Sequence, residues 1–321
     1  MDAEIKERLQ RYNQQVVFFK NYRSSYALIL KAIETTQVRG TPNCALITGP
    51  SGTGKSTLLN FVQATYPLEH HVYSEHDKRL IIPVVKCTLP PAATVKAFVK
   101  TILRSLHCDK IQGDTVDLIF RLTTLLRTAQ VQVVLIDEFQ FLIKKDACKT
   151  QEAVINCLVM LIDQTGIPFI LVGRDEEDTD SLYYRSCETL IYKRADLARR
   201  FPFHAKLDLL AYSDLQNSEY QTVLAELDAQ LFTIGELGPG THLMDSGISE
   251  RIYLASSGNI EQIKLITFNA LQLCLTQNHK GLSIDFLAKS YALLKLKNNL
   301  LDRQNPFSMS QAECSRLMNL S

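Results

Sequence analysis

Between residues 41 and 211, short apolar runs alternate with longer segments in which apolar and polar positions recur at helical spacing. The apolar runs predict buried strands at 44–48, 80–87, 131–137, 167–173 and 204–210. The periodic segments predict helices at about 55–65, 94–107, 115–129 and 150–164. Strands that alternate with helices are typical of a parallel sheet with crossover helices. We therefore expect an α/β domain, a three-layer αβα sandwich around a parallel five-stranded sheet.

The pattern is different on both sides of this region. Residues 1–40 show only helical periodicity and predict a helical leader. Residues 212–300 again show only helical patterns, at about 213–232, 248–256, 259–277 and 284–297, which predict a small all-α lid. The glycines and proline of 235–247 predict a surface loop there. The polar residues 301–321 predict a flexible C-terminal tail or a segment that docks on a partner.

Composition narrows the class of protein. With 46% hydrophobic and 21% charged residues, the chain resembles ordinary globular proteins. A net charge of +1 excludes a broadly basic nucleic-acid coat, so any DNA contact must be local. The charged N-terminus and the lack of an apolar run of about 18 residues predict a cytoplasmic protein without membrane contact.

The cysteines and histidines suggest no metal site. Eight cysteines lack the spacing of zinc ligands and are expected to be reduced thiols. His70, His71 and His76 are also spaced unlike a zinc pattern, and we expect a solvent-exposed loop there.

A glycine-rich segment follows the first predicted strand. Its residues match G-x-x-x-x-G-K-S throughout and are followed by Thr57; they are Gly49, Pro50, Ser51, Gly52, Thr53, Gly54, Lys55 and Ser56. In such a loop, backbone N–H groups and the positive end of the next helix attract nucleotide phosphates. Lys55 adds a point charge and Ser56 a ligand for Mg2+. We expect ATP and Mg2+ to bind here; a glycine-rich turn without a ligand is the weaker alternative.

The third predicted strand, in VQVVLIDEFQ, ends in two adjacent carboxylates. We expect Asp137 to hold Mg2+, through water, and Glu138 to orient and deprotonate the attacking water. This pair favours an ATPase over a small-molecule kinase, because a kinase must exclude such a water. A solvated acidic turn remains the structural alternative.

The order of these motifs, with a further strand ending in LVG and a helical lid, is that of an AAA+ ATPase. In such assemblies the nucleotide lies at a subunit boundary, where an arginine of the neighbouring subunit completes the site. Arg194, Arg199 and Arg200 lie in the appropriate region, and we favour Arg199 or Arg200. Alternatively, these cations only stabilise a helix end.

Several stretches together resemble the TnsC/TniB group of transposition ATPases, relatives of the phage Mu target-selection ATPase MuB. They are GPSGTGKSTLL, IDEFQFL, GIPFILVG, RRF and, in the lid, ASSGNIEQIKLITFNAL followed by GLSIDFLAKSYALL. The resemblance covers roughly residues 12–297. It implies an ATP-dependent ring or filament that encircles duplex DNA, marks the insertion target and recruits the transposase, often after loading by a TniQ-type protein. Gln140 is a candidate to sense the nucleotide or to face the neighbouring subunit.

The chain departs from this pattern at two positions. After the LVG strand, Arg174 stands where relatives have a small polar residue that senses the γ-phosphate. In the lid, Gln262 stands where many AAA+ proteins have a phosphate-contacting arginine, and Lys264 is a weak substitute. Both departures predict slow hydrolysis, suited to a timer, with a turnover below roughly ten per second.

The segment TVKAFVKTILRSLH predicts a helix with an apolar stripe and a separate row of cations. Lys96, Lys100 and Arg104 recur every four residues, which suits sequence-independent contacts with DNA phosphates. The resemblance adds Lys110 and Thr115 from the loop that follows. An ordinary amphipathic helix with a solvated basic face is the alternative.

Three other functions remain. An AAA+ initiator or helicase loader would share the ring, the nucleotide and DNA, although the sequence shows no winged-helix domain after the lid. A signalling P-loop NTPase would bind ATP without DNA, but such proteins usually carry a sensor or repeat region. A nucleotide or sugar kinase is disfavoured by the acidic pair.

Overall fold

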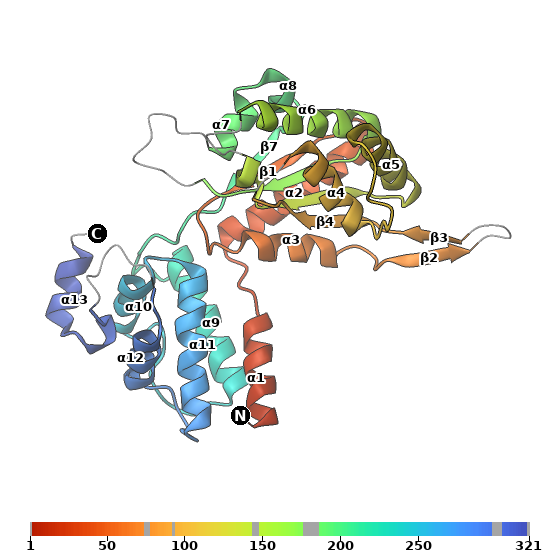
Figure 1. Cartoon of the computed structure of the whole chain (residues 1–321). Coiled ribbons are helices and arrows are strands. Elements are labelled where there is room, and N and C mark those ends of the chain that lie inside the picture. The colour runs from red at the N-terminus through yellow and green to blue at the C-terminus, as the bar shows by residue number, and fades with distance from the viewer. Residues whose placement is uncertain are drawn as a thin grey trace. The chain divides into compact units, whose positions relative to one another are not determined.

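The computed structural model of the chain describes residues 2–73, 78–91, 94–142, 148–175, 186–296 and 304–319. It divides into two compact units (Figure 1). One unit is Asn21–Leu207, and the other combines Met1–Lys20 with Asp208–Ser321.

The first unit is built around a five-stranded sheet in the order β4-β5-β6-β1-β7. Every strand pairing in this sheet is parallel. The strands are β1 (Ala45–Thr48), β4 (Val84–Thr88), β5 (Val133–Asp137), β6 (Phe169–Val172) and β7 (Phe203–Lys206). The predicted parallel five-stranded sheet is thus confirmed, and β4 and β7 form its edges.

Helices cover both faces of the sheet. They are α2 (Lys20–Arg39), α3 (Lys55–Ala64), α4 (Val95–Ser105), α5 (Thr115–Thr128), α6 (Cys148–Thr165), α7 (Cys187–Tyr192) and α8 (Ala195–Ala198), with a 3-10 turn η1 at Phe139–Leu142. One continuous apolar cluster joins alternate strand residues such as Leu46 and Val134 to Phe98 of α4, Leu122 of α5 and Leu158 of α6. The intervening strand residues face the opposite side, because side chains alternate along a strand.

A two-stranded antiparallel hairpin projects from this unit (Figure 1). It consists of β2 (His70–Tyr73) and β3 (Lys78–Ile81). The expected solvent loop is therefore wrong for residues 70–73, and the predicted strand 80–87 is two strands separated near Pro83. All four residues of β2 are exposed, so the apolar pattern that marks a buried strand is missing. His76 lies outside the described residues.

The second unit is helical. It contains α1 (Ala3–Gln14), α9 (Glu219–Gly235), α10 (Ile248–Ser256), α11 (Ile260–Thr276), α12 (Ile284–Leu293) and α13 (Gln311–Met318), with a 3-10 turn η2 at Pro306–Ser308. Helix α1 packs on α9 and α11. The Tyr12 hydroxyl shares a hydrogen bond of 2.7 Å with Thr267, and both side chains are fully buried. The two helices of the expected leader therefore fall in different compact units.

The end of the chain also differs from the expected flexible tail. Within residues 304–319, α13 packs on α10 and buries Cys314 completely. Arg251 of α10 donates to Gln311 Oε1 (2.6 Å) and to the carbonyl of Met309 (2.9 Å). Phe307 is buried as well. The segment is short and mostly polar, and its few apolar residues are buried only by contact with α10, which explains why the sequence predicted a tail.

Two findings concern the described residues only. None of the helices there is long and apolar enough to cross a membrane. Nor does that part of the chain gather three histidine, cysteine or acidic side chains into a metal-binding group.

Candidate nucleotide site

The glycine-rich loop connects β1 to α3, as the strand–loop–helix pattern predicts. Gly49 has a φ of +144°, and a Cβ atom there would lie 2.0 Å from the carbonyl oxygen of Leu207. Only glycine fits a backbone that passes another backbone so closely. The loop residues Gly49–Ser56 therefore form a tight cradle at the carboxyl end of β1.

Helix α2 supports this cradle. Gly54 has a φ of +87°, and a Cβ atom there would lie 3.1 Å from the ring of Tyr22. The Tyr22 hydroxyl donates to the Gly54 carbonyl at 3.3 Å. Tyr22 is 2% exposed, so its ring is held in place by the surrounding packing. The sequence analysis did not single out Tyr22, because its role depends on a contact between segments 32 residues apart.

Lys55 is folded back onto the loop. Its ammonium donates to the carbonyls of Gly49 (2.8 Å) and Pro50. Burial lowers the pKa of Lys55, while the nearby carboxylate of Asp137 opposes that shift. The side chain is only 8% exposed. A cation held at the bottom of a glycine cradle is placed to attract phosphate groups.

The two predicted carboxylates lie at the carboxyl end of β5. Asp137 is buried and accepts a hydrogen bond of 2.8 Å from the backbone N–H of Glu138. Glu138 adopts a left-handed φ of +59°, uncommon for a residue that is not glycine. Strained backbone of this kind concentrates at functional sites, where the surrounding structure maintains it.

Two side chains hold the carboxylate of Glu138. Gln140 Nε2 donates to Glu138 Oε2 at 2.5 Å, and the Arg174 guanidinium lies 3.3 Å from the same oxygen. Gln140 Oε1 in turn accepts from the backbone N–H of Arg174 at 3.0 Å. Gln140 therefore contacts the candidate base directly. Arg174 was noted in the sequence as a departure from the family pattern, and its contact with Glu138 is new from the structure.

The arginines proposed from the sequence have different surroundings. Arg200 is 7% exposed and binds Asp163 through two guanidinium nitrogens. Arg194 donates to Asp196 (2.7 Å) and to Asn156 (2.9 Å). Arg199 is exposed, and its side chain makes no hydrogen bond or ion pair with the described part of the chain. This placement favours Arg199 over Arg200 as a residue that reaches a neighbouring subunit.

In the helical unit, Lys264 has a structural contact. Its ammonium donates to the backbone carbonyls of Asn13 (2.6 Å) and Gln15 at the end of α1. Burial lowers the pKa of Lys264. The residue thus caps α1, which makes it a poor substitute for a phosphate-contacting arginine. Gln262 has a buried side-chain oxygen that accepts no hydrogen bond from the described residues.

The cations proposed for DNA lie on and after α4. Phe98, Val99, Ile102 and Leu103 are buried, as the apolar stripe predicts. Lys96, Arg104 and Lys110 are exposed, whereas Lys100 and Thr115 are half-buried. No ion pair joins the four cations to an acidic group within the described ranges. The structure therefore brings the cations onto the solvent side of one helix and its following loop.

Comparison with known families identifies the group to which this chain belongs. The family model described as the bacterial TniB protein matches residues 10–181, which is more than half of the chain. The chain is a member of the TniB family. A search of curated proteins found no match.

Solved structures show that this TniB-family protein has the AAA+ fold. The Aeropyrum pernix ORC2 protein in ADPNP–ADP complexes gives a TM-score of 0.60 at 15% identity, covering 88% of this chain and 71% of that one. The Aeropyrum pernix ORC1 protein in complex with DNA gives a TM-score of 0.57 at 11% identity, covering 89% of this chain and 69% of that one. The Thermotoga maritima RuvB Holliday junction branch migration motor gives a TM-score of 0.51 at 17% identity, covering 89% of this chain and 73% of that one.

The donor groups of this TniB-family site fit a nucleotide and its metal. The cradle between β1 and α3 suits phosphates because its backbone N–H groups and the first turn of α3 attract anions. Ser56, exposed in the first turn of α3, and the carboxylate of Asp137 supply oxygen ligands of the kind Mg2+ prefers. A bound Mg2+ would neutralise charge on the phosphates. Thr53 stiffens the loop by donating to the Pro50 carbonyl at 3.0 Å.

Proposed function

We propose that this protein is an ATP-dependent regulator of transposition. It assembles on duplex DNA as a ring or filament, marks the insertion target and recruits the transposase after loading by a TniQ-type protein. ATP hydrolysis to ADP and phosphate releases it. The observation that carries this proposal is the membership of the TniB family together with a Walker-type cradle, an acidic pair and a row of cations that have no acidic partner among the described residues.

ATP is the substrate of the proposed reaction. Lys55 and the backbone N–H groups of Gly49–Thr57, apart from Pro50, which has none, bind its phosphates, and Ser56 and Asp137 hold Mg2+. Glu138 orients the attacking water and accepts its proton. Arg199 enters the site of the neighbouring subunit and stabilises negative charge on the transferring phosphoryl group.

The contacts of Glu138 support the proposed slow hydrolysis. A carboxylate that accepts from Gln140 and pairs with the guanidinium of Arg174 has fewer lone pairs available for a water molecule. Its negative charge is also partly neutralised, which weakens it as a base. Slow turnover lengthens the time that an ATP-bound oligomer stays on DNA, as a target mark requires.

Duplex DNA is the proposed ligand of the α4 surface. This surface carries four cations that would contact phosphates independently of the base sequence: Lys96, Lys100, Arg104 and Lys110. Such contacts explain how a protein with a net charge of +1 binds a polyanion locally. Among the similar solved structures, the ORC1 protein of Aeropyrum pernix and the Drosophila ORC are in complexes with DNA, which is compatible with this proposal.

Negative-stain electron microscopy of the purified protein on duplex DNA tests the proposal. The samples contain either a slowly hydrolysed ATP analogue or ADP, with Lys55→Ala as the nucleotide-site control. We expect rings or filaments on DNA with the triphosphate analogue, and none with ADP or with Lys55→Ala. A protein that stays monomeric and off DNA in every sample, also after addition of its TniQ-type partner, contradicts the proposal and favours a signalling NTPase.

The second candidate is an AAA+ initiator or helicase loader, and the similarity to ORC proteins is the observation that favours it. Affinity capture with the DNA-bound oligomer separates the two candidates. The transposition regulator captures a transposase, and a loader captures a replicative helicase.

A further inference from the structure

Two short connections join the compact units. The chain crosses from one unit to the other between Lys20 and Asn21 and again between Leu207 and Asp208. We call residues 15–22 the N-terminal connection and residues 207–210 the C-terminal connection. Residues 15–19 and 207–210 form neither helix nor strand. Because a fully extended chain spans roughly 3.5 Å per residue, connections this short limit how far their two ends can separate.

In the α/β unit, both connections are attached to the glycine-rich loop. The Tyr22 hydroxyl donates to the carbonyl of Gly54, the N-cap residue of α3, at 3.3 Å. The N–H of Leu207 donates to the Thr48 carbonyl at 2.8 Å, and the Leu207 carbonyl occupies the space beside Gly49. The two ends of the loop therefore each hold one connection.

In the helical unit, both connections are attached to the start of α11. Lys264, in the second turn of α11, donates its ammonium to the carbonyls of Asn13 (2.6 Å) and Gln15. The N–H of Leu210 donates to the carbonyl of Gly258, just before α11, at 3.0 Å. A Cβ atom at Gly258 would lie 1.9 Å from the Leu210 carbonyl oxygen. Each connection thus runs from the glycine-rich loop to the first turns of one helix.

We infer that Lys264 is a positioning residue of the nucleotide site, which acts on the glycine-rich loop through the N-terminal connection and the Tyr22 hydroxyl. Its ammonium is bound by two backbone carbonyls, so it acts through the chain and not as a ligand of phosphate. Together, Lys264 and Tyr22 hold the backbone at Gly54, where the first N–H groups of α3 meet the phosphates. The inference rests on the proposed function, because the loop must first be a nucleotide site.

A coupling of this kind acts in both directions. Lys264 in the helical unit contributes to nucleotide affinity at the loop, and a nucleotide in the loop fixes the N-terminal connection. Helix α1 lies directly before that connection, so occupation of the loop also stabilises α1. Contact between Lys264 and a phosphate group would not require Tyr22, which distinguishes the two roles of the lysine.

Isothermal titration calorimetry of the full chain with a slowly hydrolysed ATP analogue and Mg2+ tests the inference. Tyr22→Phe removes the hydroxyl and keeps the ring, and Lys264→Met removes the ammonium and keeps the length of the side chain. We expect each substitution to weaken binding about fivefold. The double variant should be little weaker than either single variant, because both substitutions interrupt the same connection.

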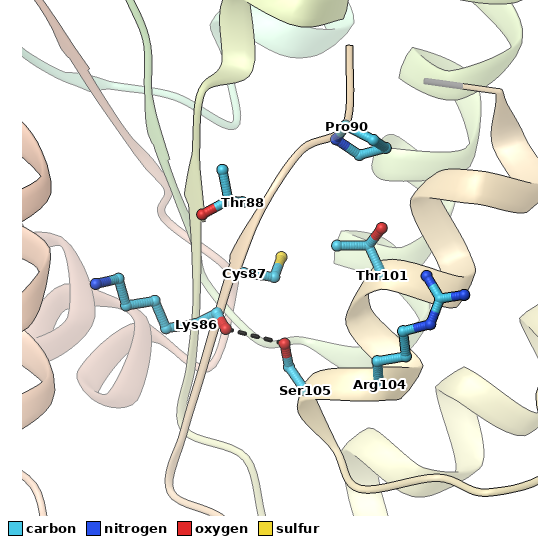
Figure 2. Close-up of a pocket in the computed structure, with 7 residues that line it drawn as sticks. All are labelled: Lys86, Cys87, Thr88, Pro90, Thr101, Arg104 and Ser105. Atoms are coloured by element: carbon cyan, nitrogen blue, oxygen red, sulfur yellow. Dashed lines mark hydrogen bonds between the residues drawn. The ribbon is translucent and has the colours of Figure 1, made fainter. Parts of the chain in front are cut away.

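Ser105→Ala is the matched control for the lost hydroxyl. Figure 2 shows Ser105 of α4 beside β4, where its hydroxyl donates to the Lys86 carbonyl at 2.9 Å. This hydrogen bond also joins a side-chain hydroxyl to a backbone carbonyl of the α/β unit, and it involves neither the glycine-rich loop nor a connection. Ser105→Ala should therefore leave the affinity for the analogue unchanged.

Hydrogen-exchange mass spectrometry gives a readout that loss of stability alone does not produce. The analogue should slow exchange in residues 3–14 of the wild-type protein about fivefold, and this difference between free and bound protein should disappear in Tyr22→Phe. Equal slowing in the wild-type protein and in Tyr22→Phe, or no slowing in the wild-type protein, overturns the inference.

The calorimetric results separate this inference from the proposed function. If the wild-type protein does not bind the analogue, the proposed function fails. If it binds and the double variant loses the product of the two single factors, roughly twenty-fivefold, Lys264 acts independently of Tyr22 and the inference is overturned. Wild-type affinity in either single variant overturns it as well.

Discussion

At the scale of single residues, the site depends on backbone conformations that few side chains permit. Gly49 combines a φ of +144° with an approach to Leu207 that excludes a Cβ atom, and Glu138 holds a left-handed conformation at the tip of β5. The motif G-x-x-x-x-G-K-S allowed the glycine cradle to be predicted. The contacts that hold Glu138 could not be predicted, since Gln140 and Arg174 meet only when β5 and β6 are neighbours.

Gly49→Ala should abolish nucleotide binding and lower the stability of the α/β unit. The strained φ alone costs about 1–3 kcal/mol, and the contact with the Leu207 carbonyl adds to it. Binding of a fluorescent ATP analogue and thermal unfolding measure the two effects. Gly40→Ala is the matched control, because Gly40 has a φ of +66° with nothing within 4 Å of an added Cβ. If Gly49→Ala and Gly40→Ala weakened nucleotide binding equally, the contact between Gly49 and the Leu207 backbone would not be what the cradle depends on.

Arg174→Ala should raise the basal rate of ATP hydrolysis several-fold. The substitution removes the guanidinium from Glu138 and leaves the carboxylate more basic and more accessible to water. Steady-state phosphate release measures the rate. Arg174→Lys keeps the positive charge, so its rate should lie between those of the wild-type protein and Arg174→Ala. If Arg174→Ala loses turnover while it retains analogue binding, Arg174 instead stabilises the transition state.

At the scale of elements, α1 and α13 show how buried contacts determine which helices pack together. Helix α1 is fixed to the helical unit by the buried pair Tyr12 and Thr267 and is capped by Lys264. Helix α13 is fixed by Arg251 and by the buried thiol of Cys314. In both cases the partner is more than 50 residues away in the sequence.

Tyr12→Phe should loosen α1 without unfolding the chain. The lost hydrogen bond is worth about 1 kcal/mol, which corresponds to roughly fivefold faster hydrogen exchange in residues 3–14. Hydrogen-exchange mass spectrometry of the full chain measures it. Tyr253→Phe is the control, because the Tyr253 hydroxyl makes no hydrogen bond with the described residues. Unchanged exchange of α1 in Tyr12→Phe would show that apolar packing alone holds the helix.

The same elements mark how much of the fold could be predicted. Strands β1, β4, β5 and β6 and helices α3 to α6 follow from apolar periodicity, since each has a buried face. The edge strand β7 is half-buried and lies at Phe203–Lys206 rather than at the predicted 204–210. The β2–β3 hairpin lacks such a face and was missed. The division of the leader and the packing of α13 depend on long-range contacts, which periodicity does not encode. The cradle and the acidic pair were predictable because their chemistry needs fixed spacing within one loop or strand end.

At the scale of the whole molecule, the proposed assembly determines which arginine acts in the site of a neighbour. Arg200 is buried in its own subunit with Asp163, whereas Arg199 is exposed. A residue that completes a neighbouring site must reach beyond its own subunit. The sequence placed the two arginines side by side, and their burial distinguishes them.

Arg199→Ala should retain binding of an ATP analogue and reduce hydrolysis by DNA-bound oligomers about a thousandfold. Arg200→Ala should instead lower the unfolding temperature, because it leaves Asp163 without its guanidinium partner. Mixing Arg199→Ala with Glu138→Gln subunits provides the sharper measurement. Turnover that recovers in the mixture shows action between subunits, and a mixture as inactive as its components contradicts it.

The hydrogen bond from Leu89 to Asp137 joins β4, which packs against α4, to β5, which bears the candidate catalytic carboxylates. In the proposed function ATP promotes binding to DNA, and such a coupling free energy between two ligands is reciprocal. Whatever factor ATP adds to the affinity for DNA, DNA adds to the affinity for ATP. A subunit on the duplex would therefore bind ATP more tightly than one in solution. The oligomer would then persist on DNA and dissociate when it is not bound to DNA.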